Sequence, residues 1–172
     1  AVANNIDNFG VIPGTAMGLA LITVVGQCVG AGRLSEAKRY AKSLIGVNYA
    51  ILLVLSLSMV LFSGELVGIY RLSEQALRLS RELITAHSIA MLVWPLAFTI
   101  PHTLRASLDA RFTMAVSVFS MWTFRIGFAY LFVYICKLGV MGIWYGMFID
   151  WIFRAAVFTL RFKGFEKRAA SV

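Results

Sequence analysis

Two charged residues lie in the middle of long apolar runs, where a charge is costly unless it has a partner. Asp150 lies at the centre of the run 140–160, and Arg125 lies at the centre of the run 112–135. Moving a single charge to the centre of a lipid bilayer costs about 2.5–3.5 kcal/mol even on a lenient insertion scale. We therefore expect both side chains to face protein or water and to have a partner.

Asp150 has two candidate partners for an ion pair inside the membrane. The link between the two runs is short, so they are expected to be neighbouring antiparallel helices with Arg125 and Asp150 at similar depth. Arg154 is the second candidate, because it lies at the i,i+4 spacing from Asp150. The pair is either a cation or proton site or a structural lock. We favour the lock, because two arginines beside one carboxylate keep it charged and make it a poor proton carrier.

The other polar residues in or near apolar runs permit two interpretations each. Asn4, Asn5, Asp7 and Asn8 precede an apolar run, where they can line a water-filled cavity or cap a helix at the outer surface, which is the more ordinary role.

His87 and His102 lie near opposite ends of the run 83–104. Histidine can relay protons, but we favour interfacial residues that bond to water or headgroups. Pro95 and Pro101 in the same run predict a kink, because proline removes a helical hydrogen bond.

The composition indicates that lipid surrounds much of this chain. Of its 172 residues, 60% are hydrophobic and only 14% are charged, whereas a soluble domain is roughly 45–50% apolar. The mean hydropathy is +0.81. The net charge of +8 does not indicate nucleic-acid binding, because the basic residues lie between apolar runs and in the tail. The sequence contains no phosphate-binding loop, HExxH, nucleophile elbow or CxxC, so we expect neither an enzyme nor a bound cofactor or metal.

Five apolar runs divide the chain, and each is close to the ~20 residues that a helix needs to cross a bilayer. They are 11–30, 43–63, 83–104, 112–135 and 140–160. Membrane strands would alternate in polarity, and these runs do not. The predicted fold class is therefore all-α: a polytopic membrane protein with about five spans in one domain, 1–172. A surface helix is expected from about residue 74 into the third span.

The basic residues predict the orientation of the spans. Ten of them fall in three regions that five spans place on one side of the membrane: Arg33, Lys38, Arg39, Lys42, Arg105, Arg111, Arg161, Lys163, Lys167 and Arg168. The other side has four: Arg71, Arg78, Arg81 and Lys137. Because cytoplasmic loops carry the excess of Lys and Arg, the C-terminus is predicted to be cytoplasmic.

Three pairs of glycines have the spacing that lets membrane helices approach closely. They are Gly14/Gly18, Gly26/Gly30 and Gly142/Gly146. This pattern is common and predicts helix packing rather than a function.

Two stretches of the chain resemble a known family. The first runs from Ile12 to Arg39 and reads P-G, then V-G-Q, then G-A-G, then A-K-R. It is similar to the second helix of either lobe in the multidrug and toxin extrusion (MATE) family. The second stretch begins at Arg105-Ala106-Ser107-Leu108-Asp109-Ala110-Arg111 and continues through Ser120–Ile126 and Gly139–Trp144 to Asp150, Arg154 and Arg161-Phe162. It resembles the last two helices of that family.

The resemblance implies a part of a secondary active transporter. The family has two lobes of six helices and exports cationic or amphipathic compounds in exchange for Na⁺ or H⁺. The five spans would be helices eight to twelve, most of the second lobe, with residues 1–9 left from helix seven. The missing N-terminal lobe, the lipid bilayer and small-molecule substrates would be its partners, in a multi-pass protein of the plasma (inner) membrane. We expect a fragment or a truncated product of that longer protein.

Four polar residues would face the central cavity in such a transporter: Asn5, Asp7, Gln27 and Thr99. Arg125 and Asp150 would brace the lobe. The span 83–104 lacks the acid that some branches of the family carry in helix ten, so no residue for the coupling ion is transferred.

The sequence leaves two alternative functions open. A lipid-linked oligosaccharide flippase shares the two-lobe architecture, but it should have a strongly basic cavity, and only Arg125 lies deep enough here. A non-transporting membrane scaffold or regulatory subunit would instead be complete at five spans.

Overall fold

The computed structural model describes residues 2–69 and 74–165, and for residues 2–7, 9 and 10 it describes the backbone alone. Within these ranges every element is a helix. In chain order they are α1 (Val2–Gly30), α2 (Leu34–Leu61), α3 (Ser63–Gly68), α4 (Glu74–Ala90), η1 (Pro95–Thr99), α5 (Ile100–Ala106), α6 (Ala110–Ser120), η2 (Met121–Gly127), α7 (Phe128–Tyr130), η3 (Leu131–Ile135) and α8 (Gly139–Lys163). The segments η1, η2 and η3 are wound as π-helix, a form that often occurs at functional sites. The all-α fold class is confirmed.

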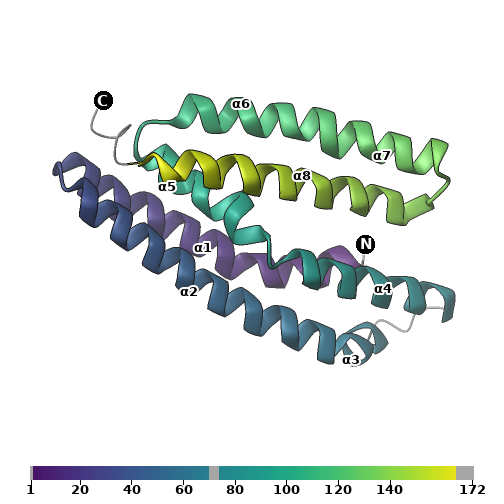
Figure 1. Ribbon diagram of the computed structural model, residues 1–172. Helices are drawn as coiled ribbons and strands as arrows, with labels where there is room; N and C mark the ends of the chain where they lie inside the picture. The colour runs from purple at the N-terminus through teal and green to yellow at the C-terminus, as the bar shows by residue number, and fades with distance from the viewer. Residues whose placement is uncertain (1, 70–73, 166–172) are drawn as a thin grey trace.

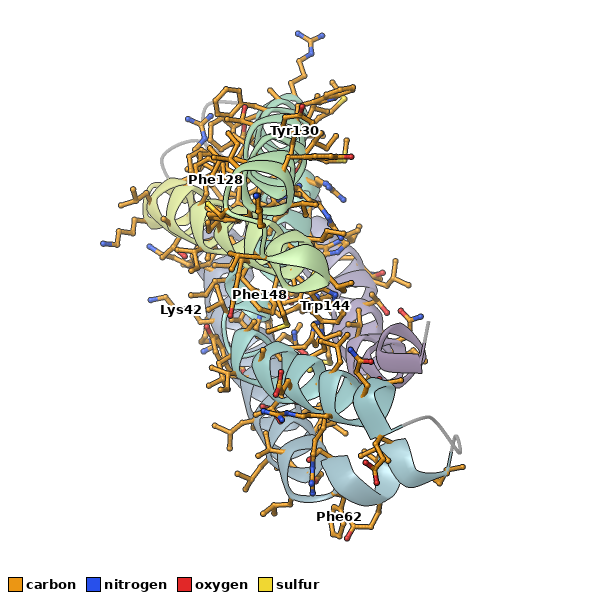
Figure 2. The ribbon with its side chains drawn as sticks, turned by 90° about the vertical axis from the view of Figure 1, so that its right-hand side faces the viewer. Lys42, Phe62, Phe128, Tyr130, Trp144 and Phe148 are labelled. Atoms are coloured by element: carbon orange, nitrogen blue, oxygen red, sulfur yellow. The ribbon has the colours of Figure 1, made fainter. Side chains whose placement is uncertain are left out.

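Two helical hairpins and a bent connection make up the bundle. One hairpin consists of α1 and α2, and the other consists of α8 and the continuous helix from α6 to η3 (Figure 1). Between them runs the segment α4–η1–α5, which packs on α1 with α5 and on α8 with η1. Figure 2, turned by 90°, shows the hairpin of α6, α7 and α8 above α4 and α2.

The bend in the middle segment lies where the prolines predict it. The axes of 74–90 and 95–106 differ by 60°, and the break lies between Ala90 and Pro95. In that break the backbone N–H groups of Leu92, Val93 and Trp94 donate to carbonyls only three residues back. Pro95 has no N–H to donate and its ring crowds the preceding turn, which favours a break in the helix at this point.

The predicted spans agree with the helices in four cases. Four helices are long and apolar enough to cross a membrane, namely 11–30, 34–61, 110–135 and 139–163, and the bent pair 74–90 and 95–106 is the fifth if it counts as one span. The run predicted as one span at 83–104 is therefore a bent segment. The prediction that residues 1–9 belong to a preceding helix is wrong for 2–9, because α1 runs unbroken from Val2 through Pro13.

The turn between α1 and α2 explains part of the G-A-G pattern. Gly32 has φ +71°, in the left-handed region that glycine enters without steric cost. The N–H of Gly32 donates to the carbonyl of Val29 at 3.0 Å, and the N–H of Arg33 donates to that of Cys28 at 2.8 Å. These two bonds form the Schellman motif that ends a helix.

The described parts of the three basic regions assigned to one side lie at the same end of the bundle, and Lys167 and Arg168 lie outside the described residues. The α1–α2 turn, the α5–α6 link and the C-terminal end of α8 all lie there (Figure 1). Arg161 of α8 makes an ion pair with Asp109 of the link, with its Nε 2.8 Å from the carboxylate Oδ2. Buried apolar side chains from the helices that meet at this end pack into one cluster. Its members are Leu21, Val25, Cys28, Ala37, Ala41, Ile45, Ile100, Leu104, Phe158, Phe162 and Phe165.

Two of the three glycine pairs mediate close packing. A Cβ at Gly14 would overlap with the ring of Trp94, and one at Gly18 would lie 2.6 Å from His102. A Cβ at Gly146 would lie 2.9 Å from the backbone nitrogen of Ala129, so α8 touches its hairpin partner there. The prediction is wrong for the third pair within the described residues, because nothing lies within 4 Å of a Cβ at Gly26 or Gly30.

We predict that Gly146→Ala destabilises the protein and that Gly46→Ala does not. The methyl group at position 146 meets backbone that cannot rotate away, at a cost of about 1–3 kcal/mol. Gly46 is the matched control, because it lies inside α2 with open space around it, where alanine favours the helix. Thermal unfolding of the purified protein in detergent measures both effects. Equal melting temperatures for the two variants would contradict the close contact of α8 with α7.

Candidate functional site

Asp150 lies at the centre of a largely buried polar network. Its Oδ1 accepts a hydrogen bond from Arg154 Nε at 2.8 Å and a short one from the hydroxyl of Ser120. Arg154 also donates from Nη2 to the backbone carbonyl of Ser117, at 3.1 Å. The Asp150 side chain is 0% exposed and that of Arg154 is 11% exposed. The network thus connects α8 to α6.

The structure corrects the choice of partner for Asp150. Arg154, the second candidate, makes the ion pair, and Arg125 does not take part in it. The reason is a difference in depth, because α8 faces the carbonyl of Arg125 at Gly146. Asp150 lies four residues further along the helix, which is about 6 Å at a rise of 1.5 Å per residue. The role of the pair stays a prediction.

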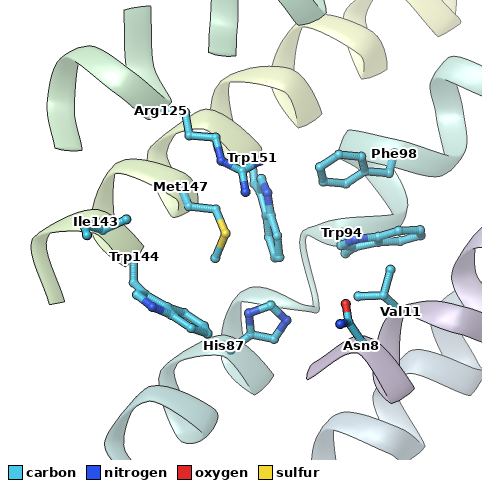
Figure 3. Close-up of a pocket in the computed structure, with 10 residues that line it drawn as sticks. All are labelled: Asn8, Val11, His87, Trp94, Phe98, Arg125, Ile143, Trp144, Met147 and Trp151. Atoms are coloured by element: carbon cyan, nitrogen blue, oxygen red, sulfur yellow. The ribbon is translucent and has the colours of Figure 1, made fainter. Parts of the chain in front are cut away.

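A pocket of about 370 Å³ opens between α8, η2 and the bend of the middle segment. Figure 3 shows its lining, most of which is aromatic or apolar: Asn8, Val11, His87, Trp94, Phe98, Arg125, Ile143, Trp144, Met147 and Trp151. Its volume falls within the usual range for small-molecule sites, at roughly 300–1,000 Å³. It is the candidate functional site of the chain.

The aromatic wall of this pocket is a continuous set of ring contacts. The His87 ring lies edge-on to Trp144 and to Trp151, with 5.3 Å between ring centres in both cases. Trp151 in turn meets Phe98 edge-on at 5.6 Å, and Phe98 stacks on Trp94 at 5.1 Å. The wall therefore joins α8 to both arms of the bent segment. In Figure 2, Trp144 lies between α8 and α4.

The bend and a glycine position this wall. Trp94 immediately precedes Pro95, so the break in the helix turns its ring toward α1. Gly14 of α1 leaves the space that the ring of Trp94 occupies. The Pro13-Gly14 pair of the first sequence stretch thus has a local role, because it admits an aromatic side chain of the pocket.

Arg125 lies at the open pocket and not in the interior network. Its side chain is exposed and points from η2 toward the pocket (Figure 3). It makes no hydrogen bond or ion pair within the part of the chain that the structure describes. The indole Nε1 of Trp151, only 4% exposed as a residue, also finds no acceptor among the described residues.

Gln27 and Thr99, the two predicted cavity residues whose side chains the structure describes, do not line the pocket. Asn5 and Asp7 lie in the first turns of α1, and their side chains lie outside the described residues. Their neighbour Asn8 lines the pocket. Gln27 is exposed near the other end of α1 and lines none of this pocket.

The prediction that Thr99 faces the cavity is wrong. Its side chain is 0% exposed and accepts a hydrogen bond of 2.7 Å from Asn48 Nδ2, which holds η1 against α2. A threonine on a buried helix serves as readily for interhelical bonding as for a cavity.

The interfacial interpretation of the histidines is wrong for His87. This residue is 4% exposed and lies among aromatic rings at the pocket. His102 is half-buried and packs on Gly18 of α1.

Sequence reasoning missed the aromatic residues of the pocket. One signal was available: Trp144, Phe148 and Trp151 recur at i, i+4 and i+7 on one face of α8, and Trp94 and Phe98 at i and i+4. Such a stripe is ordinary in a membrane helix. Only the packing of α8 against the bend shows that it lines a pocket.

Both the sequence and the fold of this chain match those of known proteins. A sequence profile described as MatE matches residues 1–131. The chain belongs to the MatE family. This MatE chain also superposes on a solved structure described as "Crystal structure of MATE in the bent conformation" with a TM-score of 0.86. The match has 20% sequence identity and covers 98% of this chain and 38% of the other.

Two bacterial relatives illustrate the sequence similarity. The probable multidrug resistance protein NorM of Thermotoga maritima is 25% identical over 171 residues, which are 96% of this chain and 36% of that protein. The probable multidrug resistance protein YoeA of Bacillus subtilis is 24% identical over 145 residues, 84% of this chain and 31% of that protein. The MatE chain thus spans about a third of the length of these relatives.

We predict that Asp150 and Arg154 are energetically coupled. Arg154→Gln leaves a buried carboxylate without its cation, which typically costs about 3–5 kcal/mol. Asp150→Asn leaves Arg154 alone, and the double variant should recover part of the loss because neither charge is then unpaired. Thermal unfolding in detergent measures the cycle, with Arg125→Gln paired with Asp150→Asn as the control that should show no coupling. Strong coupling to Arg125 and none to Arg154 would reject the network.

Proposed function

We propose that this chain forms most of the second lobe of a secondary active multidrug efflux transporter. Membership of the MatE family supports the proposal, as does the fold, which covers 38% of a solved MATE structure. Two of the similar bacterial proteins are described as probable multidrug resistance proteins. The remaining helices would come from the N-terminal lobe, and the two lobes would rock against each other to give alternating access.

The pocket is the part of this lobe that we assign to the substrate pathway. It has the size of a small-molecule site, and its aromatic wall offers wide, sequence-tolerant contacts to flat organic compounds. The substrates would be cationic or amphipathic compounds, exported in exchange for Na⁺ or H⁺. We assign no residue to the coupling ion.

The proposed orientation places the basic end of the bundle in the cytoplasm. That end holds Arg33, Arg105 and Arg161, and the positive-inside rule assigns such an end to the cytoplasmic side of the plasma membrane. The link between η3 and α8, which carries Cys136 and Lys137, would then face outward.

Cysteine labelling in intact cells tests this orientation with a native residue. Cys136 is exposed in the outer link, whereas Cys28 is buried. In a variant whose sole cysteine is Cys136, an impermeant maleimide added outside should react readily. In the matched variant with Ser35→Cys as the sole cysteine, it should react only after permeabilisation, because Ser35 is exposed at the basic end. The reverse pattern would invert the topology.

Transport assays test the proposed activity. The complete two-lobe protein in proteoliposomes should accumulate or expel a fluorescent dye when a Na⁺ or H⁺ gradient is imposed, and the 172-residue chain alone should not. Trp144→Ala should lower dye transport severalfold, because it removes a wall of the pocket. The adjacent Tyr145→Ala is the control, since Tyr145 is not among the residues that line this pocket. Gradient-driven transport by the chain alone would contradict the two-lobe mechanism.

A further inference from the structure

Arg154 connects the buried polar network to the wall of the pocket. Its guanidinium lies over the ring of Phe98, with 5.7 Å between Cζ and the ring centre. Phe98 comes from η1 and lines the pocket. The ion pair of Arg154 with Asp150 lies within α8, and its bond to the carbonyl of Ser117 reaches α6. One side chain of α8 therefore contacts both α6 and the bent segment.

Hydrogen bonds fix the guanidinium of Arg154 on the side away from the ring system. Its Nε donates to Asp150 at 2.8 Å, and its Nη2 donates to the carbonyl of Ser117 at 3.1 Å. Arg154 is buried, so water has little access to these bonds. A planar guanidinium bonded through two nitrogens keeps a fixed plane, and an aromatic face attracts such a cation within ~6 Å of the ring centre. The guanidinium is thus a rigid support for Phe98.

Phe98 connects the rings of the aromatic wall. It stacks on Trp94 with 5.1 Å between ring centres, and it meets Trp151 edge-on at 5.6 Å. Figure 3 shows these three rings next to one another along one side of the pocket. Trp151 belongs to α8 and Trp94 to the break in the bent segment. A displacement of Phe98 would therefore disturb the wall on both sides.

We propose that Arg154 is a positioning residue for the pocket. Held by Asp150 and the carbonyl of Ser117, it fixes Phe98 and through it the shape of the aromatic wall that substrates contact. Arg154 is not among the described residues that line the pocket, so it acts through the ring and not by touching the substrate. This inference rests on the proposed function, which assigns the pocket to the substrate pathway. It gives the buried ion pair a role in binding in addition to locking two helices together.

Equilibrium binding to the complete two-lobe transporter in detergent tests the proposal. The probe is rhodamine 6G, a flat fluorescent cation whose fluorescence polarisation rises when it binds. Arg154→Lys keeps a cation beside Asp150, but an ammonium group cannot bond to the Ser117 carbonyl and cover the ring with a planar face. This variant should raise the Kd about threefold to tenfold, which is the size of effect expected for a lost cation–π contact. A merely structural role would lower the amount of binding-competent protein and leave the Kd unchanged.

Arg161→Lys is the matched control. Arg161 also lies on α8, its Nε pairs with the carboxylate of Asp109 at 2.8 Å, and its Cζ lies 4.3 Å from the ring centre of Phe112. The same kind of arginine, carboxylate and aromatic ring is thus present at the basic end of the bundle, away from the pocket. The identical substitution there should leave the Kd for rhodamine 6G unchanged.

A double-variant cycle tests whether Arg154 acts through Phe98. Phe98→Leu alone should raise the Kd, because it removes a ring from the wall. When Phe98→Leu is already present, Arg154→Lys should add less than about a twofold loss, since the guanidinium then has no ring to support. Full additivity of the two losses would overturn the inference.

A second variant covers the case in which Arg154→Lys does not fold. The double variant Asp150→Asn with Arg154→Gln leaves neither charge unpaired, and it should raise the Kd for rhodamine 6G by a similar factor because it also lacks the guanidinium. A wild-type Kd in the variant that folds, or an equal rise in Arg161→Lys, would overturn the proposal.

Failure of the proposed function has a different result. If the pocket does not bind the substrate, Trp144→Ala leaves the Kd unchanged. If Trp144→Ala weakens binding and Arg154→Lys does not, the pocket keeps its assignment and only the role of Arg154 is rejected.

Discussion

A bilayer offers no water to the polar groups of a helix, so the backbone groups must bond within the protein and polar side chains gain from partners there. In this chain the polar partners lie on different helices. Asp150 and Arg154 of α8 bond to Ser120 and Ser117 of α6. Asn48 and Ser56 of α2 bond to Thr99 of η1 and to the carbonyl of Ser88 in α4. These few bonds specify which helices are neighbours, because apolar side chains pack almost as well against lipid as against one another.

The bent segment is the second determinant of the architecture. A straight helix from 74 to 106 would lie along one neighbour, whereas the 60° bend lets α5 pack on α1 and η1 pack on α8. The bend also separates α4 from the first part of α8 enough to leave the pocket, and it turns Trp94 toward α1. Pro95 thus connects the packing of the two hairpins to the shape of the candidate site.

The sequence predicts the elements of this fold better than its site. Hydrophobic run length, proline position and basic links are local signals, and they predict four spans, the bend and the common end of the basic links. The partner of Asp150 depends on the depth of each charged residue in the membrane, to within one helical turn. The centres of the apolar runs do not define that depth closely enough. The burial of Thr99 and His87 depends on which face of each helix packs against a neighbouring helix. The pocket combines residues from α1, α4, η1, η2 and α8, so no local pattern contains it.

The helix α4 has a consequence for how the protein is made. It carries Glu74, Arg78, Arg81 and Glu82 in its first turns, and it is not among the helices that are long and apolar enough to span a membrane alone. A ribosome would deliver it to the insertion machinery after α2 and before α6, when the first hairpin of this chain has been made and the second has not. Its buried side chains, Leu83, Ile84, His87 and Ser88, need α2 on one side and α8 on the other. The packing site of α4 is therefore complete only after α8 has been synthesised, and the bundle should acquire its pocket only when the hairpin of α6–η3 and α8 has closed.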